Sequence, residues 1–256
     1  MLGNFVTGVS ILAPAGMLPE LSQEFGVSIR EAGLLITFGA FVLCVASPVS
    51  AWLTSRVDRR LLLSISVAIM AAAQFASMLA PNYATLMTIR LLMLAVAALF
   101  TPQAAGTAAM MVPPERRGST MSYVFLGWSL ALAIGLPLIA YVASHVGWRV
   151  AYGGIGVIAL LNLAMLVSRI PGGLVGTPVE LKTWADLARN PLIVLLLIIT
   201  VLQTSGQFVV FTFLGPLFAK LGGNAQLAIV AFSIYGVMGF IGNVIASRVV
   251  DSWGGY

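Results

Sequence analysis

The stretch Leu53-Thr54-Ser55-Arg56-Val57-Asp58-Arg59-Arg60 decides the fold, because it places four charges between two long apolar runs. Residues 32–54 and 61–89 carry no charged side chain. About twenty apolar residues are enough to cross the hydrocarbon core of a bilayer as a helix. The charges between such helices must lie in water or among lipid headgroups. The stretch is therefore predicted to be a tight loop that joins two membrane-spanning helices.

The composition supports the same conclusion for the whole chain. Of its 256 residues 60% are hydrophobic and 8% are charged, and the mean hydropathy is +1.03. A soluble protein carries about 25% charged residues. The net charge of +5 is therefore assigned to loops beside anionic lipid and not to nucleic-acid binding. The single Cys44 excludes a disulfide framework, and no metal site or cofactor is predicted.

Apolar runs predict an all-α membrane protein with about eight transmembrane helices. Pro, Gly or charged residues mark most of the short connections, so successive helices are expected to be antiparallel neighbours. The predicted spans are residues 1–19, 32–54, 61–80, 84–112, 119–144, 150–168, 191–219 and 225–248.

The distribution of Lys and Arg predicts the orientation. With the N-terminus in the cytoplasm, the inner loops hold nine of these residues and the outer loops three, with Arg90 inside a span. Both ends of this chain are therefore expected on the cytoplasmic side. The nine are Arg56, Arg59, Arg60, Arg116, Arg117, Arg169, Lys182, Arg189 and Arg248, and the three are Arg30, Arg149 and Lys220.

A longer connection, residues 170–190, divides the chain. It predicts a short helix that lies in the inner membrane surface, with a plain linker as the alternative. Thr177, Pro178 and Glu180 would cap the start of this helix, and Leu181, Trp184 and Leu187 share one of its faces. The predicted domains are a six-helix bundle over 1–169, this linker over 170–190, and the first two helices of an incomplete second bundle over 191–256.

A weaker version of the opening loop sequence is found near the end of the chain. It reads Ser247-Arg248-Val249-Val250-Asp251-Ser252-Trp253-Gly254, and its Asp251 follows Pro216 at nearly the separation at which Ser55 follows Pro19. Internal repeats of this kind are typical of transporters. The second copy stops within the loop that would lead to a ninth span, so the chain is expected to be truncated there.

These features resemble the major facilitator superfamily, and within it the drug–proton antiporters with twelve spans. That group's loop motif is similar to Ala51, Ser55, Arg56, Val57, Asp58, Arg59 and Arg60, although Ser55 replaces an Asp and Asp58 replaces a Gly. Further matches are Arg90 with Pro102, Gly127 with Gly135-Leu136-Pro137, Gly147-Trp148-Arg149, and Gly242-Asn243 with Asp251 and Gly254.

The resemblance implies a major-facilitator-type bundle in the bacterial inner membrane that moves a small solute, by efflux and with possible proton coupling. It also implies a monomer for a full-length form. Antiporters of this group often carry a carboxylate in the first span, where this chain has Ser10 and Ile11. A different class of function stays open, a non-transporting membrane fragment or interaction module. The residues show no nucleophile triad or phosphate loop, so an enzyme is not expected.

Six residues are candidates for the solute pathway. Arg90 would line the pathway, because a charge inside a span faces a cavity or a partner; a side chain that reaches out to the membrane surface is the alternative. Gln203 and Gln207 are four residues apart, on one helix face, in a span that lines the central cavity of this fold. Asn4, Ser10 and Tyr235 are weaker candidates. For these five polar residues, hydrogen bonding between helices is the alternative.

Seven residues are candidates for gating. Gly135 and Pro137 interrupt the fifth span, which gives either a pliable point or close helix packing. Arg56, Asp58, Arg59 and Arg60, together with Asp251 in the second copy, would close the inner side by pairing with the opposite bundle. The alternative is that the basic residues of the loop only set the topology.

Overall fold

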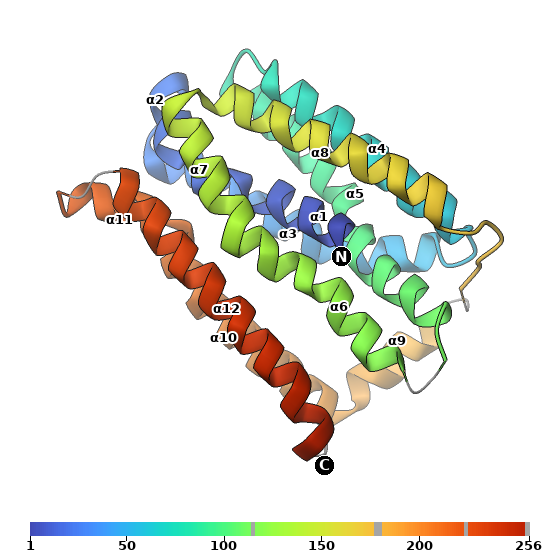
Figure 1. The fold of residues 1–256 in the computed structure, drawn as a ribbon. Helices are drawn as coiled ribbons and strands as arrows, with labels where there is room; N and C mark the ends of the chain where they lie inside the picture. The colour runs from blue at the N-terminus through green and yellow to red at the C-terminus, as the bar shows by residue number, and fades with distance from the viewer. Residues whose placement is uncertain (114–115, 177–180, 223–224, 254–256) are drawn as a thin grey trace.

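The computed structural model describes residues 1–113, 116–176, 181–222 and 225–253, and for residues 181–184, 219, 225, 228 and 246–253 it describes the backbone alone. All its regular elements are helical (Figure 1). They are α1 (Leu2–Leu12), η1 (Ala13–Gly16), α2 (Leu18–Phe25), α3 (Ile29–Leu53), α4 (Arg59–Met78), α5 (Tyr83–Met110), α6 (Arg117–Leu130), η3 (Ala131–Gly135), α7 (Leu136–His145), α8 (Trp148–Arg169), α9 (Leu181–Arg189), α10 (Pro191–Thr212), α11 (Leu214–Lys220) and α12 (Ala225–Trp253).

The helices confirm the predicted all-α membrane bundle. Within the described residues six helical segments are long and apolar enough to cross a bilayer, and a bent pair of helices near the N-terminus makes a seventh. The eighth predicted span corresponds to α12, whose apolar part is Ile229–Ile245. The opening loop is as tight as predicted, because α3 ends at Leu53 and α4 begins at Arg59.

The first and seventh spans are not the continuous helices that the sequence predicted. Helix α1 ends at Leu12, passes through the turn η1, and continues as α2 at an angle of 58°. Pro14 causes the break, because it has no N–H to continue the α-helical ladder. The seventh span likewise stops at Thr212 and resumes as α11 after Phe213.

The fifth span is helical throughout but changes its winding. Five residues, Ala131–Gly135, form a π-helical turn between α6 and α7. Pro137 follows directly and has no N–H for the carbonyl of Ala133, so the ladder must change its spacing there. Val9 of α1 fills the space beside Gly135, where an added Cβ would lie 2.3 Å from a Val9 methyl carbon. The predicted interruption therefore takes the form of a π-turn with close packing.

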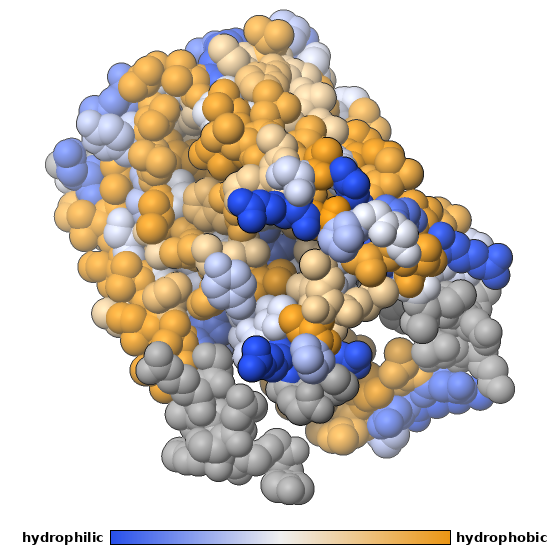
Figure 2. All heavy atoms as spheres, turned by 45° about the vertical axis from the view of Figure 1, so that its right-hand side comes forward, coloured by the Kyte–Doolittle hydropathy of each residue, from blue (hydrophilic) through white to orange (hydrophobic). Residues whose placement is uncertain are grey.

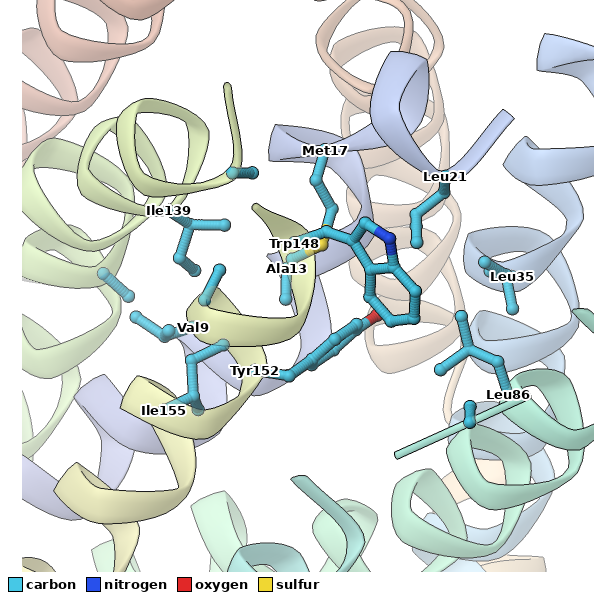
Figure 3. Close-up of a cluster of buried hydrophobic side chains, with 14 residues drawn as sticks. Val9, Ala13, Met17, Leu21, Leu35, Leu86, Ile139, Trp148, Tyr152 and Ile155 are labelled. Atoms are coloured by element: carbon cyan, nitrogen blue, oxygen red, sulfur yellow. The ribbon is translucent and has the colours of Figure 1, made fainter. Parts of the chain in front are cut away.

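The core of the first six spans is built mostly from buried aliphatic and aromatic side chains. Figure 3 shows Trp148 and Tyr152 of α8 among Met17, Leu21 and Ala13 of the bent first span. The two aromatic rings of α8 meet edge to face, with centroids 5.9 Å apart. Between membrane helices such contacts stabilise the bundle through van der Waals packing, so the bend in the first span is held by the core around it.

Helices α10 and α12 pack against this bundle through a smaller cluster. Its buried members are Leu12, Leu136, Phe211 and Phe232, which come from both halves of the chain. Gly236 of α12 lies directly on the backbone of η3, where an added Cβ would be 2.2 Å from the Cα atom of Ala133. Helix α10, in contrast, buries only its last two residues.

The outer surface of the molecule suits a bilayer. In Figure 2 apolar side chains cover much of the visible face, and hydrophilic ones gather in separate clusters. Exposed large apolar residues line α3 and α10, as expected for helices that contact lipid or further helices. A helix, α9, is present where the sequence predicted the helix of the linker, whose predicted capping residues Thr177, Pro178 and Glu180 lie outside the described residues.

Candidate functional site between the two halves

Arg90 is fully buried in the middle of the first six spans. Its guanidinium donates from Nη1 to the carbonyl of Ser10 at 3.3 Å and from Nη2 to the carbonyl of Ile11 at 3.1 Å. A backbone N–H at position 14 would donate to the carbonyl of Ser10 in an α-helical turn, or to that of Ile11 in a 3₁₀ turn. Because Pro14 has no N–H, the broken first helix leaves both acceptors to Arg90.

The burial of Arg90 rules out the alternative in which its side chain reaches the membrane surface, because none of it is exposed. Its Nε and the neighbouring Ser10 Oγ are buried without a hydrogen-bond partner. The phenol of Tyr152 lies within reach of its charge. No carboxylate that the structure describes forms an ion pair with this guanidinium. Arg90 therefore joins α5 to the break in the first span through carbonyl acceptors.

Asn4 belongs to a chain of hydrogen bonds that joins α1, α5 and α6. Its Nδ2 donates to the carbonyl of Val124 at 3.1 Å, and its Oδ1 accepts from Thr101 Oγ1 at 3.1 Å. Thr101 in turn accepts from Nε1 of Trp128 at 3.3 Å. Both polar groups of the Asn4 amide are thus engaged, which favours its role between helices over direct contact with a solute.

A pocket of 530 Å³ lies between the first half of the chain and α10. Residues of α1, α3, α5 and α6 form one wall, and the stretch from Thr204 to Phe213 forms the other. Its lining is apolar and aromatic apart from a few hydroxyl groups, which is the usual character of a small-molecule site. Gln203 is exposed and lies next to Thr204, just outside this pocket.

A second pocket, of 810 Å³, lies between α6 and η3 on one side and α10 and α12 on the other. The predicted residues Gln207 and Tyr235 both line it, and the Gln207 amide donates to the Tyr235 hydroxyl. Asn243 also lines it and donates from Nδ2 to Ser129 Oγ at 3.1 Å. The structure thus brings Gln207 and Tyr235 together, and separates them from the buried Ser10 and Arg90.

The charged loop contacts the start of the linker and its own bundle. Arg59 donates to Gln103 Oε1 at 2.5 Å and to the Ser55 carbonyl at 3.3 Å, and Arg60 donates to the Val167 carbonyl at 2.6 Å. All three partners belong to the first six spans, although pairing with the opposite bundle was expected. Arg56 is exposed, and the side chain of Asp251 lies outside the described side chains.

Asp58 attaches the linker to this loop. Its carboxylate caps α4 by accepting from the Leu61 N–H at 2.9 Å, and it also accepts from the Gly173 N–H at 2.6 Å. The Arg59 N–H donates to the Leu174 carbonyl at 2.8 Å. The bonds from the Leu61 and Gly173 N–H groups outweigh partial burial and lower the pKa of Asp58 below its ordinary value. Asp58 therefore holds the linker and the helix start while it is ionised.

Three residues that the sequence did not single out are central to this geometry. Pro14 frees the carbonyls that Arg90 binds, Thr101 connects Asn4 to Trp128, and Trp128 lines the pocket beside α10. A proline and a tryptophan in the middle of apolar spans were the available signals. Thr101 carried no such signal in the sequence, because its partners on α1 and α6 are known only from the packed structure.

Comparison with known proteins was made on the whole chain. A family model described as Major Facilitator Superfamily matches residues 1–256. The protein named "Probable sugar efflux transporter" of Mannheimia succiniciproducens is 28% identical over 246 residues, which cover 96% of this chain and 62% of that protein. "Inner membrane transport protein YdhP" of Escherichia coli K12 is 29% identical over 254 residues, 98% of this chain and 64% of that protein. The chain spans less than two thirds of the length of these relatives.

Solved structures share the arrangement of the helices. The partially occluded, inward-open xylose transporter XylE from E. coli matches with a TM-score of 0.77 at 17% identity, over 99% of this chain and 70% of that one. A D-xylose-proton symporter matches with a TM-score of 0.75 at 18% identity, over 98% of this chain and 67% of that one. At these identities the likeness concerns the fold.

Proposed function

The chain belongs to the Major Facilitator Superfamily, and from this premise we propose that it acts in the secondary transport of a small solute by alternating access between two helical bundles. The observation that carries the proposal is the pocket between the first half and α10, which lies where two bundles meet. Residues 1–169 would form one bundle, 170–190 the linker, and 191–256 the part of the second bundle that this chain contains. The same premise favours a carrier over an enzyme.

Efflux is the proposed direction, and a sugar is the first solute to test. A relative that covers 96% of this chain bears the name of a probable sugar efflux transporter. The hydroxyl groups around the pocket can hydrogen-bond a polyol, while its aromatic rings can pack on the apolar face of one. The bacterial inner membrane is the proposed location, with both ends of this chain in the cytoplasm as the Lys and Arg distribution predicts.

Proton coupling is proposed as a feature to be tested separately. The first span holds no carboxylate before Glu20, and Arg90 is fully buried in the bundle. Because an Arg guanidinium keeps its proton in proteins, coupling would need an acid at a span end such as Glu20, whose carboxyl is partly buried with one oxygen unpartnered. That carboxyl would bind and release a proton during the cycle.

The test is solute flux in liposomes that contain the purified chain. We expect labelled sugars to exchange across the membrane faster than in empty liposomes, and Arg90→Ala to abolish the exchange. Collapsing an imposed proton gradient should stop net movement; continued movement would identify a uniporter. If neither a sugar nor any other small solute moves while the protein is folded, as judged by its circular dichroism, the transport proposal fails and a non-transporting membrane module takes its place.

A further inference from the structure

Trp128 is held in one orientation by contacts on two sides. Gly8 of α1 lies under its ring, where an added Cβ would be 3.2 Å from Cε3 and 3.4 Å from Cδ2. Its Nε1–H donates to Thr101 Oγ1 at 3.3 Å. The Thr101 hydroxyl gives its one hydrogen to Asn4 Oδ1, so its direction is fixed as well. A large ring that a small residue and a hydrogen bond both position is suited to binding, because little rotamer freedom remains to be lost.

The ring of Trp128 lines the 530 Å³ pocket from the side of the first bundle. Phe208 and Phe213 of the second half line the opposite wall. The polar groups around the pocket are hydroxyls, from Thr37 on α3 and from Thr204, Ser205 and Thr212 on α10. A solute in this pocket would thus contact apolar rings on two sides and single hydroxyl groups between them.

The chemistry of the lining limits what the pocket can take. No charged side chain is found among the described residues that line it. The guanidinium of Arg90, a fully buried charge in the same bundle, is absent from the lining and donates to the carbonyls of Ser10 and Ile11. A charged solute would lose its hydration here without gaining a counter-charge, which is costly. An uncharged molecule loses far less.

We propose that this pocket is a solute site for an uncharged, amphipathic molecule, whose flat apolar face stacks on Trp128 while its hydroxyl or carbonyl edge meets the threonine hydroxyls. Asn4 and Thr101 act as positioning residues for the ring. The proposal rests on the proposed transport function and adds the substrate class and the residue that selects it. Neither the charged loop nor the Gln207–Tyr235 pair takes part in this selection.

The test uses three probes that share one aromatic ring and differ in charge. They are para-nitrophenyl glucoside, para-nitrophenyl phosphate and para-nitrobenzyl trimethylammonium, and their binding to the purified chain in nanodiscs is measured by equilibrium dialysis. We expect the neutral glucoside to bind at least about tenfold more tightly than either charged probe. No binding of the glucoside, or equal binding of all three probes, would overturn the proposal.

Variants of Trp128 test the role of the ring. Trp128→Leu should weaken glucoside binding by about tenfold, whereas Trp128→Phe keeps a stacking face and should stay within about threefold of the natural protein. Trp52→Leu is the matched control, because Trp52 is an exposed residue of α3 outside this pocket. Equal affinity in the Trp128→Leu and Trp52→Leu variants would contradict the assignment.

Variants of Thr101 test the positioning role. Thr101→Val keeps the volume but removes the hydroxyl that accepts from Trp128, so the near-ultraviolet circular dichroism should change and the affinity should fall by about threefold. Thr101→Ser should restore both. If Thr101→Val loses neither its spectrum nor its affinity, the positioning role is wrong.

Flux measurements separate this inference from the transport proposal. Transport of sugars that is unaffected by Trp128→Leu would overturn the site and leave the transport function standing. Binding of the glucoside that depends on Trp128, without flux of any sugar, would support the site and overturn the transport function.

Discussion

The first helices of the two halves share one design and differ in what surrounds them. Each is a long helix that breaks and is followed by a short helix and then a second long one: α1, α2 and α3 in the first half, α10, α11 and α12 in the second (Figure 1). Most of α1 is buried, and Arg90 of α5 binds the carbonyls at its break. Helix α10 buries only its last two residues. The same order of helices thus gives a buried first helix where neighbours in this chain enclose it and an exposed one where they do not.

The largest effect is expected at the break in α1. Arg90→Ala leaves two buried carbonyls without donors, and an unpaired buried acceptor costs about 1–3 kcal/mol in soluble proteins, while bonds between membrane helices average roughly 0.6 kcal/mol. We therefore expect a loss of about 1–3 kcal/mol of stability, seen as a lower midpoint of thermal unfolding in detergent. The unfolding midpoint of Arg90→Lys should lie between those of Arg90→Ala and the natural protein, since Lys keeps the charge but cannot donate in the bidentate geometry of a guanidinium.

The matched control for that change lies in α10. Gln203→Ala alters an exposed side chain of α10, the corresponding helix of the second half, so its unfolding midpoint should stay at that of the natural protein. If Arg90→Ala and Gln203→Ala have the same midpoint, the contrast between the two helices does not hold.

The contact between the halves gives the next largest effect. Gly236→Ala would place a Cβ 2.2 Å from the Cα of Ala133, so α12 must shift away from η3 at a cost of about 1–3 kcal/mol. Gly239→Ala, in the same helix, meets no atom within 4 Å and should be neutral or slightly stabilising through its higher helix propensity. Thermal unfolding and protease sensitivity of α12 measure the difference; equal behaviour of the two variants would show that α12 is not docked on η3.

Acid should loosen the linker before it disturbs the bundle. The folded state lowers the pKa of Asp58, so its ionised form favours the folded contacts above the ordinary aspartate pKa of about 3.9. This contribution is lost as the pH falls through the lowered value. We expect hydrogen exchange at Gly173 and Leu174, corrected for the intrinsic effect of pH, to become several-fold less protected in that range. Asp58→Asn should show the reduced protection already at neutral pH, and normal protection in this variant would contradict the role.

The smallest effect is expected at the ion pair between α2 and α8. Arg149 Nη1 lies 2.5 Å from Glu24 Oε1, but both side chains are about two fifths exposed (40% and 43%), so the pair contributes at most about 0.5 kcal/mol. Glu24→Gln should barely change the unfolding midpoint. Arg149→Ala should cost more, because Arg149 also bonds the Ala80 carbonyl and lies over the Trp148 ring at 4.3 Å. A larger loss from Glu24→Gln than from Arg149→Ala would reverse this assignment.

The sequence predicted what depends on composition and local pattern. Apolar runs located the spans, and the charged loop at Leu53–Arg60 was placed correctly because charges and apolar runs separate so sharply there. The helix of the linker was predicted from its amphipathic face, and α9 lies at that position, while its place in the membrane surface stays a prediction. These features follow from transfer free energies that each segment carries with it.

What the sequence left open depends on contacts between distant segments. Arg90 was recognised as unusual, but its partners are carbonyls freed by Pro14, which no side-chain pattern reveals. The chain from Asn4 through Thr101 to Trp128 joins three helices and exists only in the packed bundle. The loop residues predicted to form a gate hydrogen-bond within the first half and the start of the linker. Arg59 and Arg60 bond to α5 and α8, and Asp58 accepts from the Gly173 N–H.

The most direct test of two bundles that move about a common pocket is a pair of distances measured by spin labelling. With Cys44 replaced by serine, labels at Leu53 and Ile245 report on the linker end of the molecule, and labels at Leu79 and Leu221 report on the end that carries α2 and α11. Adding para-nitrophenyl glucoside should lengthen one of the two distances and shorten the other. Two distances that both stay fixed, or that change in the same direction, would contradict alternating access.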